Sequence, residues 1–426
     1  MRFRAVALTG ALGLAACASS TGTATTGTAT TGRPSTVTSA TTTRITASTG
    51  TATTPGSSTV VVATVTSAVT SNGLPAEAGP VPAGVPPAAV PGPARAWIET
   101  TEDTVRLDKP GPPTSARRYA YVASAYAEAR ALGSPEQAGE VARRVLLALA
   151  PARADLIAAA AARLGVTGAL PPAVEAVATR SLARLAGDGW TAGDPAAAMA
   201  GEPAGPGHWI RVGGAGPADA TAGSWLRWLV PDGPDTAAPA PPAFGTPEYA
   251  QQQSIVADAV RLRDARWQAV IEFWGGTPGT QAPAGIWQDR LWTEAQGTAL
   301  ATDDLALARA QSALARTVAD AFMACWRAKF TWWTARPSMS DPAISVAMAN
   351  PPFPGYVSGH STISAAAAAV LSWLVPERHD RWWADAAQAR DSRLVAGIHF
   401  EIDNREGFAL GTRVGNLAAA RLKEGT

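Results

Sequence analysis

Side chains and backbone groups suited to binding an oxyanion are concentrated in the last hundred residues of the chain. They fall in three short segments: KFTWWTARP at 329–337, VSGHST at 357–362 and SRLVAGIHFEID at 392–403. Together these segments offer three cationic side chains, two histidines, several hydroxyls and the amides of a helix start. Proteins hold phosphate-like anions with charge-assisted hydrogen bonds and free backbone N–H groups. The sequence therefore predicts a site for a tetrahedral or trigonal-bipyramidal oxyanion.

The middle segment lies where a proline-rich loop is predicted to turn into a helix. Residues 350–375 read NPPFPGYVSGHSTISAAAAAVLSWLV, in which glycines permit a tight backbone and Ser358 or Ser361 can cap the helix. A helix start carries free amides and a partial positive charge, so it favours an anion near Gly359. His360 stands at that point, in a position to donate a proton to an oxyanion or to a leaving group.

The upstream segment contributes Lys329 and Arg336. They are seven residues apart, which is two turns if both lie on one helix, and Pro337 is predicted to end that helix. The apolar pattern of a predicted helix at 302–333 places Lys329 on its buried face, where an unpaired ammonium group is costly. A buried anion accounts for this lysine. The alternative is a lysine that reaches solvent, and it is the weaker reading once Arg336 is considered.

The downstream segment contributes Ser392, Arg393, His399 and Asp403. Asp403 follows His399 by four residues, so on a continuous helix its carboxylate lies one turn away. A carboxylate in that place orients an imidazole that acts as a ligand or nucleophile. Pairing of Asp403 with Arg405 is the alternative.

These three segments resemble one superfamily. The pattern K-x6-R-P, then S-G-H, then S-R-x5-H-x3-D resembles the signature shared by type 2 phosphatidic acid phosphatases, bacterial acid phosphatases and vanadium-dependent haloperoxidases. One position departs from it, because Val357 stands where the signature has a proline before S-G-H. The resemblance covers residues 329–403 and extends more weakly back to about residue 265. The form P-P-F-P-x-Y-x-S-G-H is similar to the haloperoxidase branch.

The resemblance implies a vanadium-dependent haloperoxidase whose cofactor is vanadate and whose substrates are hydrogen peroxide and a halide. His399 is then the vanadium ligand, Asp403 orients it, and His360 is the acid–base group. The implied oxyanion-binding residues are Lys329, Arg336, Ser358, the Gly359 amide, Ser392 and Arg393.

Two alternatives remain open. In a phosphomonoester or lipid-phosphate hydrolase the same residues work without a cofactor. His399 is then the nucleophile that forms a phosphohistidine, and His360 protonates the leaving alcohol. The second alternative is a surface lipoprotein that keeps the fold without turnover.

The chain begins with a predicted targeting segment. Residues 1–17 have arginines, a short apolar core and LAAC ending at Cys17, which looks like a bacterial lipoprotein signal with lipidation of that thiol. An ordinary secretory signal is the alternative. Residues 18–92 are rich in Thr, Ser, Gly, Ala and Pro and are predicted to be a disordered tether. We therefore expect an exported protein anchored to a bacterial membrane by lipid alone.

The remaining residues, 93–426, are predicted to form one all-α domain, because β-branched alternation is scarce. Segment 187–246 is a long Gly/Pro/Trp-bearing excursion, expected to pack over the domain as part of an entrance. The predicted helices are 115–133, 135–150, 152–164, 171–186, 247–274, 302–333, 361–375 and 380–400.

Composition excludes several function classes. The net charge is +1 and no basic run occurs, so nucleic acid is not an expected partner. Apart from the signal, the longest apolar stretch is short, so no transmembrane helix is expected in the mature chain. No H-E-x-x-H or C-x-x-C occurs, and Zn, Ca and Mg sites are unsupported. Cys325 is expected in the core, and His208 and His379 are expected to be structural.

Overall fold

The structure is a computed structural model that describes residues 73–75, 77–85, 91–166, 168–190, 201–211 and 216–425. Regular secondary structure in these ranges is helical, and two isolated β-bridges accompany it. The predicted all-α fold class is confirmed. Within the same ranges, no helix has the length and apolar character needed to cross a membrane. The predicted signal with Cys17, and most of the predicted tether, lie outside the described residues.

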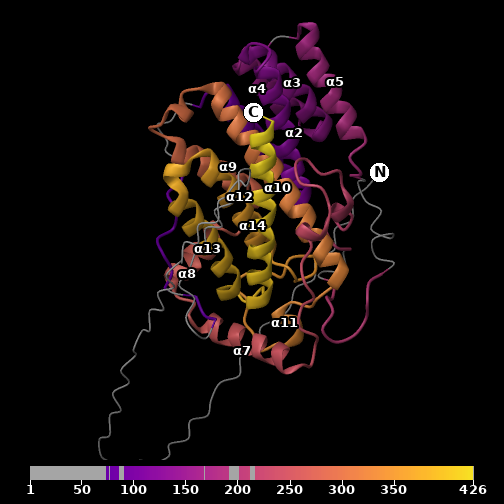
Figure 1. The fold of residues 1–426 in the computed structure, drawn as a ribbon, viewed down its shortest axis with the longest axis vertical. Coiled ribbons are helices and arrows are strands. Elements are labelled where there is room, and N and C mark those ends of the chain that lie inside the picture. The colour runs from indigo at the N-terminus through magenta and orange to yellow at the C-terminus, as the bar shows by residue number, and fades with distance from the viewer. Residues whose placement is uncertain are drawn as a thin grey trace, which may run out of the picture. The chain divides into compact units, whose positions relative to one another are not determined.

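The helices, with their observed bounds, are α1 (Pro93–Asp108), α2 (Pro112–Arg130), α3 (Pro135–Leu149), α4 (Ala154–Arg163), α5 (Pro172–Ala186), α7 (Pro247–Arg261), α8 (Ala265–Phe273), α9 (Ala282–Ala295), α10 (Asp304–Trp332), α11 (Pro337–Ser340), α12 (Gly359–Leu374), α13 (His379–Val395) and α14 (Glu401–Glu424). In Figure 1, α2 to α5 gather near one end of this arrangement, and α7 and α11 lie near the other.

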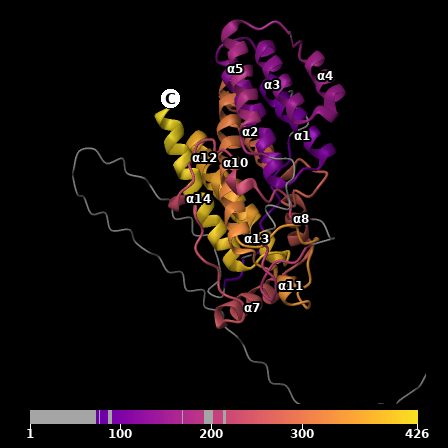
Figure 2. The same ribbon diagram turned by 90° about the vertical axis from the view of Figure 1, so that its right-hand side faces the viewer.

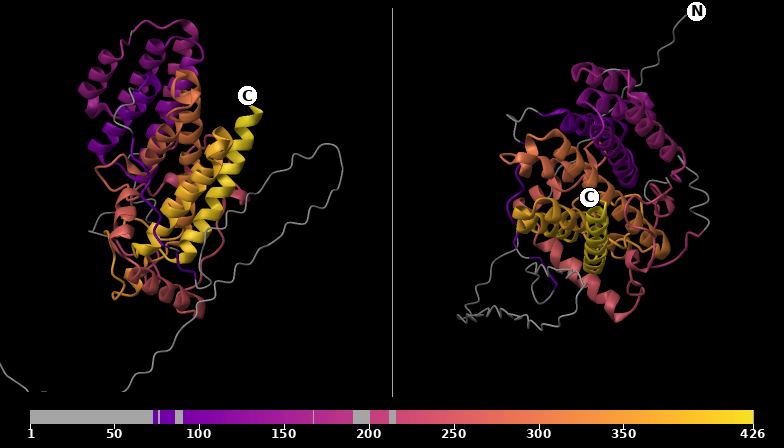
Figure 3. Two further views of the ribbon diagram at one scale, coloured as in Figure 1. Left: turned by 90° about the vertical axis from the view of Figure 1, so that its left-hand side faces the viewer. Right: turned by 45° about the horizontal axis from the view of Figure 1, so that its top comes forward.

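The long helices α10, α12 and α14 contact one another pairwise and run through the middle of the described domain (Figures 1 and 2). Buried side chains form two clusters. The smaller cluster joins α2, α3 and α5, and the larger one surrounds α10, α12, α13 and α14. The two other views show the helices from the early part of the chain grouped beside α10 (Figure 3). The residues of the oxyanion signature all lie on the helices of the larger cluster or in the loops between them.

The closest helix contact in this core joins α12 and α14. Three glycines of α14, four residues apart, face the backbone of α12. A Cβ atom added to Gly407 would meet Ser358 O at 2.8 Å, one on Gly411 would meet Thr362 O at 1.9 Å, and one on Gly415 would meet Ala366 O at 2.6 Å. This spacing lies on one helical face, so the absence of side chains there lets the two backbones approach.

Several predicted helices have different bounds in the structure. The predicted helix 247–274 is two helices, because Asp264 caps a new one by accepting a hydrogen bond from Trp267 N at 2.8 Å. The helix predicted at 302–333 begins with Asp303 as its N-cap. Helices α1, α9, α11 and α14 were not predicted.

The helix predicted at 380–400 is wrong at its end. It stops at Val395, and Gly397 follows with φ +75°, a backbone conformation that side-chain-bearing residues rarely adopt. A new helix, α14, starts at Glu401. His399 therefore lies in the short link between two helices.

Part of the predicted tether packs on the domain. Pro75 and Pro82 are buried. The Pro80 carbonyl accepts a hydrogen bond from Gln388 Nε2 at 3.0 Å, and the Ala83 carbonyl accepts one from Arg290 Nη1 at 2.9 Å. The packed part of the chain therefore starts before the predicted boundary at residue 92.

The described parts of the 187–246 excursion lie against α10. Trp209 and Trp225 are buried, as expected of a segment that packs over the domain. The buried carboxylate of Asp320 on α10 accepts the backbone N–H groups of residues 228, 229 and 230 at 2.7–2.9 Å. Three such bonds to one carboxylate hold this part of the excursion in register with α10.

The glycine contact between α12 and α14 gives a first prediction. Ala favours a helix over Gly, so Gly411→Ala would be stabilising on helix propensity alone. Because its Cβ would overlap the α12 backbone, we expect it instead to lower the free energy of unfolding by about 1–3 kcal/mol. Chemical denaturation measures this.

Gly425→Ala is the matched control, because a Cβ there would meet no atom closer than 3.9 Å. Equal stability of the two variants would contradict the close approach of α12 and α14.

Candidate active site

The three signature segments converge on one buried place. Lys329 stands in the last turn of α10 and Arg336 precedes α11, while Ser358, Gly359 and His360 form the start of α12. The remaining signature residues are Ser392 and Arg393 at the end of α13, His399 in the following link and Asp403 in the first turn of α14.

The prediction that Lys329 and Arg336 share one helix is wrong. Helix α10 ends at Trp332, where Trp333 takes a left-handed conformation with φ 50°. Pro337 begins α11 and does not end α10. The turn at Trp333 redirects the chain, so the two cations approach the site from different directions.

Lys329 is fully buried. Its Nζ donates to the carbonyls of Pro354 and Gly355 at 2.8 and 2.7 Å, both in the loop before α12. Burial, with a smaller effect from the charge of Arg336, lowers the pKa of this ammonium group to about 7, whereas Cys325 and Asp403 oppose the shift. The alternative in which Lys329 reaches solvent is excluded by its 0% exposure.

Arg336 is also fully buried and joins three parts of the site. Its Nη1 donates to Ile398 O at 2.8 Å and faces His399 Nε2 at 3.3 Å, and its Nη2 donates to Phe353 O at 3.1 Å. Desolvation lowers the pKa of its guanidinium to about 10. The lowered pKa reflects the cost of holding this charge away from water.

His399 has one defined tautomer. The guanidinium of Arg336 can only donate, so Nε2 of His399 accepts and carries no proton. The proton is therefore on Nδ1, which donates to Asp403 Oδ2 at 3.0 Å. Burial, followed by the charge of Arg336, lowers the pKa of the imidazole well below its usual value. A neutral ring with an unprotonated Nε2 is the form that coordinates a metal or attacks phosphorus.

Asp403 contacts His399 as expected, but from a different helix position than predicted. The two residues do not share a helix; Asp403 is in the first turn of α14, and its Oδ2 also accepts the Phe400 N–H at 3.1 Å. Arg405 pairs with Glu401 and Glu406 and leaves Asp403 to the histidine. Burial raises the pKa of the Asp403 carboxyl to about 7, against the opposing hydrogen bond from Phe400 N.

Arg393 is the third fully buried cation. Its Nη2 donates to Ile271 O at 2.9 Å, its Nε donates to Ser392 Oγ at 2.9 Å, and its Nη1 lies 3.3 Å from the sulfur of Met348. Burial lowers its pKa to about 9. Ser392 therefore positions Arg393, and its own hydroxyl donates to Ala389 O at 2.6 Å. The thioether is a weak acceptor, so Nη1 keeps most of its capacity to bind an anion.

Ser358 is the N-cap of α12. Its Oγ accepts from Ser361 N at 3.4 Å and from Ser361 Oγ at 3.0 Å, which resolves the choice between the two serines. Its N–H donates to Asp403 O at 2.9 Å and ties the start of α12 to the start of α14. Gly359 follows as the first helical residue, packed near Phe322 and Trp326. The Tyr356–Val357 peptide bond before this turn is cis.

His360 points away from the Ser358 cap. Its Nε2 donates to Trp274 O at 2.8 Å, since a carbonyl only accepts, and the neutral ring therefore has its free lone pair on Nδ1. Burial and the nearby charge of Arg393 lower its pKa well below the usual value. His360 lines a cavity of about 340 Å³.

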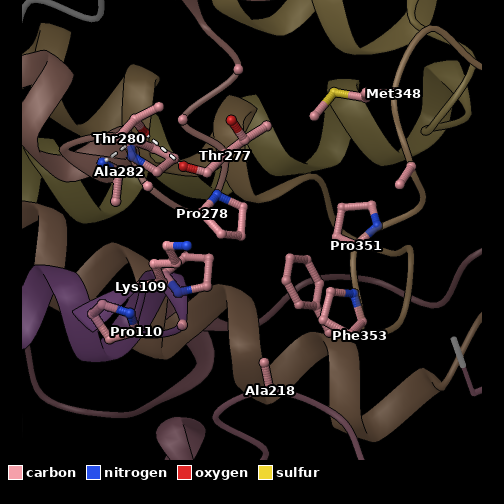
Figure 4. A pocket seen from close by; sticks show the side chains of 18 of the residues that line it. Lys109, Pro110, Ala218, Thr277, Pro278, Thr280, Ala282, Met348, Pro351 and Phe353 are labelled. Atoms are coloured by element: carbon pink, nitrogen blue, oxygen red, sulfur yellow. Dashed lines mark hydrogen bonds between the residues drawn. The ribbon is translucent and has the colours of Figure 1, made fainter. Parts of the chain in front are cut away.

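The cavity brings together parts of the chain that are far apart in sequence (Figure 4). Gly275 to Pro278 follow α8, Lys109 and Pro110 follow α1, and Met348 to Phe353 precede α12. Ala218 from the excursion also lines it, and the entrance role of that segment stays a prediction. The sequence analysis did not find Lys109, Met348 or Trp274, because no local spacing relates them to the signature.

The charges of the site do not balance among the described residues. Lys329, Arg336 and Arg393 are each 0% exposed, and Asp403 is the carboxylate that opposes the first two. Within the described ranges, no acidic side chain offsets the desolvation of Arg393. Buried charges are stable only when paired, so this arrangement suits an oxyanion carrying about two negative charges.

Three residues outside the signature were predicted to be structural: Cys325, His208 and His379. Cys325 is buried and in contact with Val357 O, as predicted for a core residue. His208 pairs with Thr334 in an isolated bridge and does not line the cavity. His379 starts α13, and its ring lies 6.4 Å from that of Trp383.

Comparison with known proteins supports the same assignment of fold. Residues 309–424 match the family model of the PAP2 superfamily, so the predicted superfamily is confirmed. A crystal structure described as the first bacterial vanadium-dependent iodoperoxidase is similar, with a TM-score of 0.67 and 18% identity, and the match covers 80% of this chain and 98% of that one.

Two structures of bacterial vanadium-dependent chloroperoxidase are also similar. The apo and holo forms each match with a TM-score of 0.55 and 12% identity, over 80% of this chain and 96% and 94% of theirs. No curated protein matches the sequence.

The unbalanced cations give a second prediction. An oxyanion that binds only the folded protein raises its stability, by about 2.7 kcal/mol at a hundred times its dissociation constant. Orthovanadate or phosphate should therefore raise the Tm of the wild-type chain. In Lys329→Met the buried charge is removed, so the anion-free protein should be as stable or more stable, by up to about 4 kcal/mol.

The Lys329→Met variant should at the same time gain little stability from either anion. Lys423→Met, at the exposed end of α14, is the control and should respond like wild type. An equal anion response of Lys329→Met and wild type would contradict the assignment of Lys329.

The lowered pKa of Lys329 gives a third prediction, on pH. Its folded pKa, about 7, lies below its ordinary value of 10.5, so the unfolded chain binds this proton more tightly. The anion-free protein therefore gains stability as pH rises from 7 toward 10.5. Over the same rise the site loses positive charge, and the carboxyl of Asp403 ionises near pH 7, so anion affinity should fall.

Sulfate is the suitable probe because it keeps the same charge over this range. Its affinity, measured by calorimetry, should fall by up to about tenfold per pH unit for each proton lost. The fall should be shallower in both Lys329→Met and Asp403→Asn. Sulfate affinity that does not change between pH 6 and 9 would contradict the lowered pKa of Lys329 and the raised pKa of Asp403.

Proposed function

Starting from the PAP2-superfamily domain at residues 309–424, we propose that this chain is a vanadium-dependent haloperoxidase, which uses hydrogen peroxide to oxidise a halide. The observation that carries the proposal is the set of three buried cations around an unprotonated His399 Nε2. The haloperoxidase-like sequence P-P-F-P-x-Y before Ser358 favours this reaction over phosphate ester hydrolysis.

The side chains fit vanadate as the cofactor. Lys329, Arg336 and Arg393 supply the positive charge that its oxygens need. His399 Nε2 carries no proton, so the lone pair that accepts from Arg336 here would be the one to coordinate vanadium. When bound, vanadate supplies a Lewis acid that activates hydrogen peroxide toward attack by a halide. The rest of the chemistry falls to the protein's own groups.

Each of these groups has a defined task. Asp403 holds the proton of His399 on Nδ1 and so keeps Nε2 available as a ligand. His360 is the group at the cavity that can take a proton from an incoming substrate, on Nδ1, while Nε2 stays bound to Trp274 O. Burial of all three cations keeps water away and strengthens their electrostatic effect on the bound anion.

A phosphatase acting at the same residues is the second candidate. The tautomer of His399, with an unprotonated Nε2 and with its Nδ1 proton bonded to Asp403, is also that of a nucleophile that forms a phosphohistidine. In that reaction Lys329, Arg336 and Arg393 stabilise the charge of the transferring phosphoryl group. His360 would protonate the leaving alcohol only after Nδ1 has taken up a proton, because the neutral ring has its proton on Nε2, bound to Trp274 O. A third candidate, a lipoprotein without turnover, predicts neither activity.

We further propose that the mature chain is exported and anchored to a bacterial membrane through lipid on Cys17. The supporting observation is the sequence LAAC after a short apolar run. Mass spectrometry of the membrane-associated protein should find lipid on Cys17. The Cys17→Ser variant should leave the membrane fraction.

The fourth prediction separates the two enzymes. The full chain is freed of phosphate, divided, and loaded or not with orthovanadate; both portions are assayed for peroxide-dependent bromination and for hydrolysis of a phosphomonoester. We expect bromination that requires vanadate and little hydrolysis. Hydrolysis that vanadate inhibits, without bromination, would identify the phosphatase instead.

His399→Ala should abolish whichever activity is present, since it removes the ligand or nucleophile. Loss of a single stabilising donor in such sites typically costs on the order of 10²–10³ in rate, and His399 is expected to cost at least as much. His379→Ala, a histidine at the start of α13 away from the cavity, is the control and should keep full activity. Full activity in His399→Ala would overturn the assignment of the site.

A further inference from the structure

The cavity beside His360 is apolar almost throughout. Its described lining consists mainly of proline, glycine and alanine residues, together with the ring of Phe353 and the side chains of Met348 and Ile398. Its volume of about 340 Å³ is in the range of sites for small organic molecules. Hydrogen peroxide and halide ions are much smaller and gain nothing from apolar walls, so the cavity is built for a different molecule.

Two ionisable residues, His360 and Lys109, are among the described lining residues of the cavity. His360 belongs to the active site and is bonded to Trp274 O. Lys109 stands beside Pro110 and Pro278 on one side of the cavity, with Pro351 and Phe353 across from it (Figure 4). The cavity therefore has a histidine and a cationic group facing a mainly apolar space, with Thr277, Thr280 and Asn350 as its other polar lining residues.

The ammonium group of Lys109 is available to a ligand. Lys109 is exposed and ends α1 in a left-handed conformation with φ 52°. In the part of the chain that the structure describes, its Nζ makes no hydrogen bond or ion pair. The adjacent Asp108 is already paired, with Arg118 at 2.8 Å and Arg153 at 2.6 Å. Its carboxylate therefore does not neutralise Lys109.

Part of the cavity wall contacts two of the three buried cations. Phe353 and Ile398 line the cavity, and their carbonyls accept the hydrogen bonds of Arg336. Met348 lines it as well, and its sulfur contacts Arg393. A molecule bound in the cavity thus lies against residues that contact Arg336 and Arg393.

We propose that this cavity binds the organic acceptor of the reaction, a molecule with an apolar, aromatic-sized body and one acidic group that pairs with Lys109. The apolar body gains free energy by leaving water, and proline-lined walls lose little conformational freedom on binding it. The acidic group stays at the exposed Lys109, where its solvation is largely kept. The acceptor is then halogenated next to the site at which the oxidised halide forms.

This inference rests on the proposed haloperoxidase function for its reaction, but binding of the acceptor can be measured without turnover. Two probes of the same shape are compared by calorimetry: 2-naphthoate, which is anionic at neutral pH, and 2-naphthamide, which is neutral. Orthovanadate is present at saturation, so that the carboxylate does not occupy the oxyanion site. The full chain is used as wild type, Lys109→Gln and Lys423→Gln.

We expect both probes to bind wild type, with 2-naphthoate the tighter of the two. Lys109→Gln should weaken 2-naphthoate by about three- to fivefold, the range for an exposed ion pair, and leave 2-naphthamide unchanged. Added salt should reduce the difference between the probes. Lys423→Gln, an exposed lysine at the end of α14, should bind both probes like wild type.

Three outcomes would overturn the proposal: equal weakening of both probes by Lys109→Gln, unchanged binding of 2-naphthoate in that variant, or no binding of either probe. Displacement of 2-naphthoate by further orthovanadate would place it at the oxyanion site and would also overturn the proposal. None of these depends on bromination, so a failed acceptor site and a failed haloperoxidase are told apart.

Discussion

The desolvation of three cations around one histidine is the constraint on which the rest of the structure depends. Lys329, Arg336 and Arg393 are fully buried, and burial lowers the pKa of each. Without an anion they rest on backbone carbonyls, a serine hydroxyl and a thioether, which satisfy their donors but do not neutralise their charge. The fold therefore holds an electrostatic cost that a bound oxyanion would relieve, and in the proposed function that relief would give the site its affinity.

The scaffold has to keep these groups together against their mutual repulsion. The glycine face of α14 lets its backbone lie against α12, and the hydrogen bond from Ser358 N to Asp403 O joins the two helix starts. Asp403 thereby reaches His399 from one side while Arg336 reaches it from the other. The contact between α12 and α14 thus also places Asp403 where its carboxylate fixes the tautomer of His399.

The sequence predicted the all-α fold, the superfamily and the candidate residues because those depend on local spacing. It placed Ser358 at the start of a helix and Lys329 on a buried face, and both lie there. It failed where tertiary packing decides the backbone, as at Gly397, which ends α13 before His399, and at Trp333, which separates Lys329 from Arg336. Lys109 was missed because it lies more than 200 residues before the signature, and no periodicity relates residues so far apart.

The most direct test of the central claim is a crystal structure of the full chain grown with orthovanadate, using the anomalous signal of vanadium to locate it. The account predicts one vanadium atom bonded to His399 Nε2, with its oxygens facing Lys329, Arg336 and Arg393. Vanadium bound elsewhere, or an empty site with the three cations still on their carbonyls at saturating orthovanadate, would contradict it.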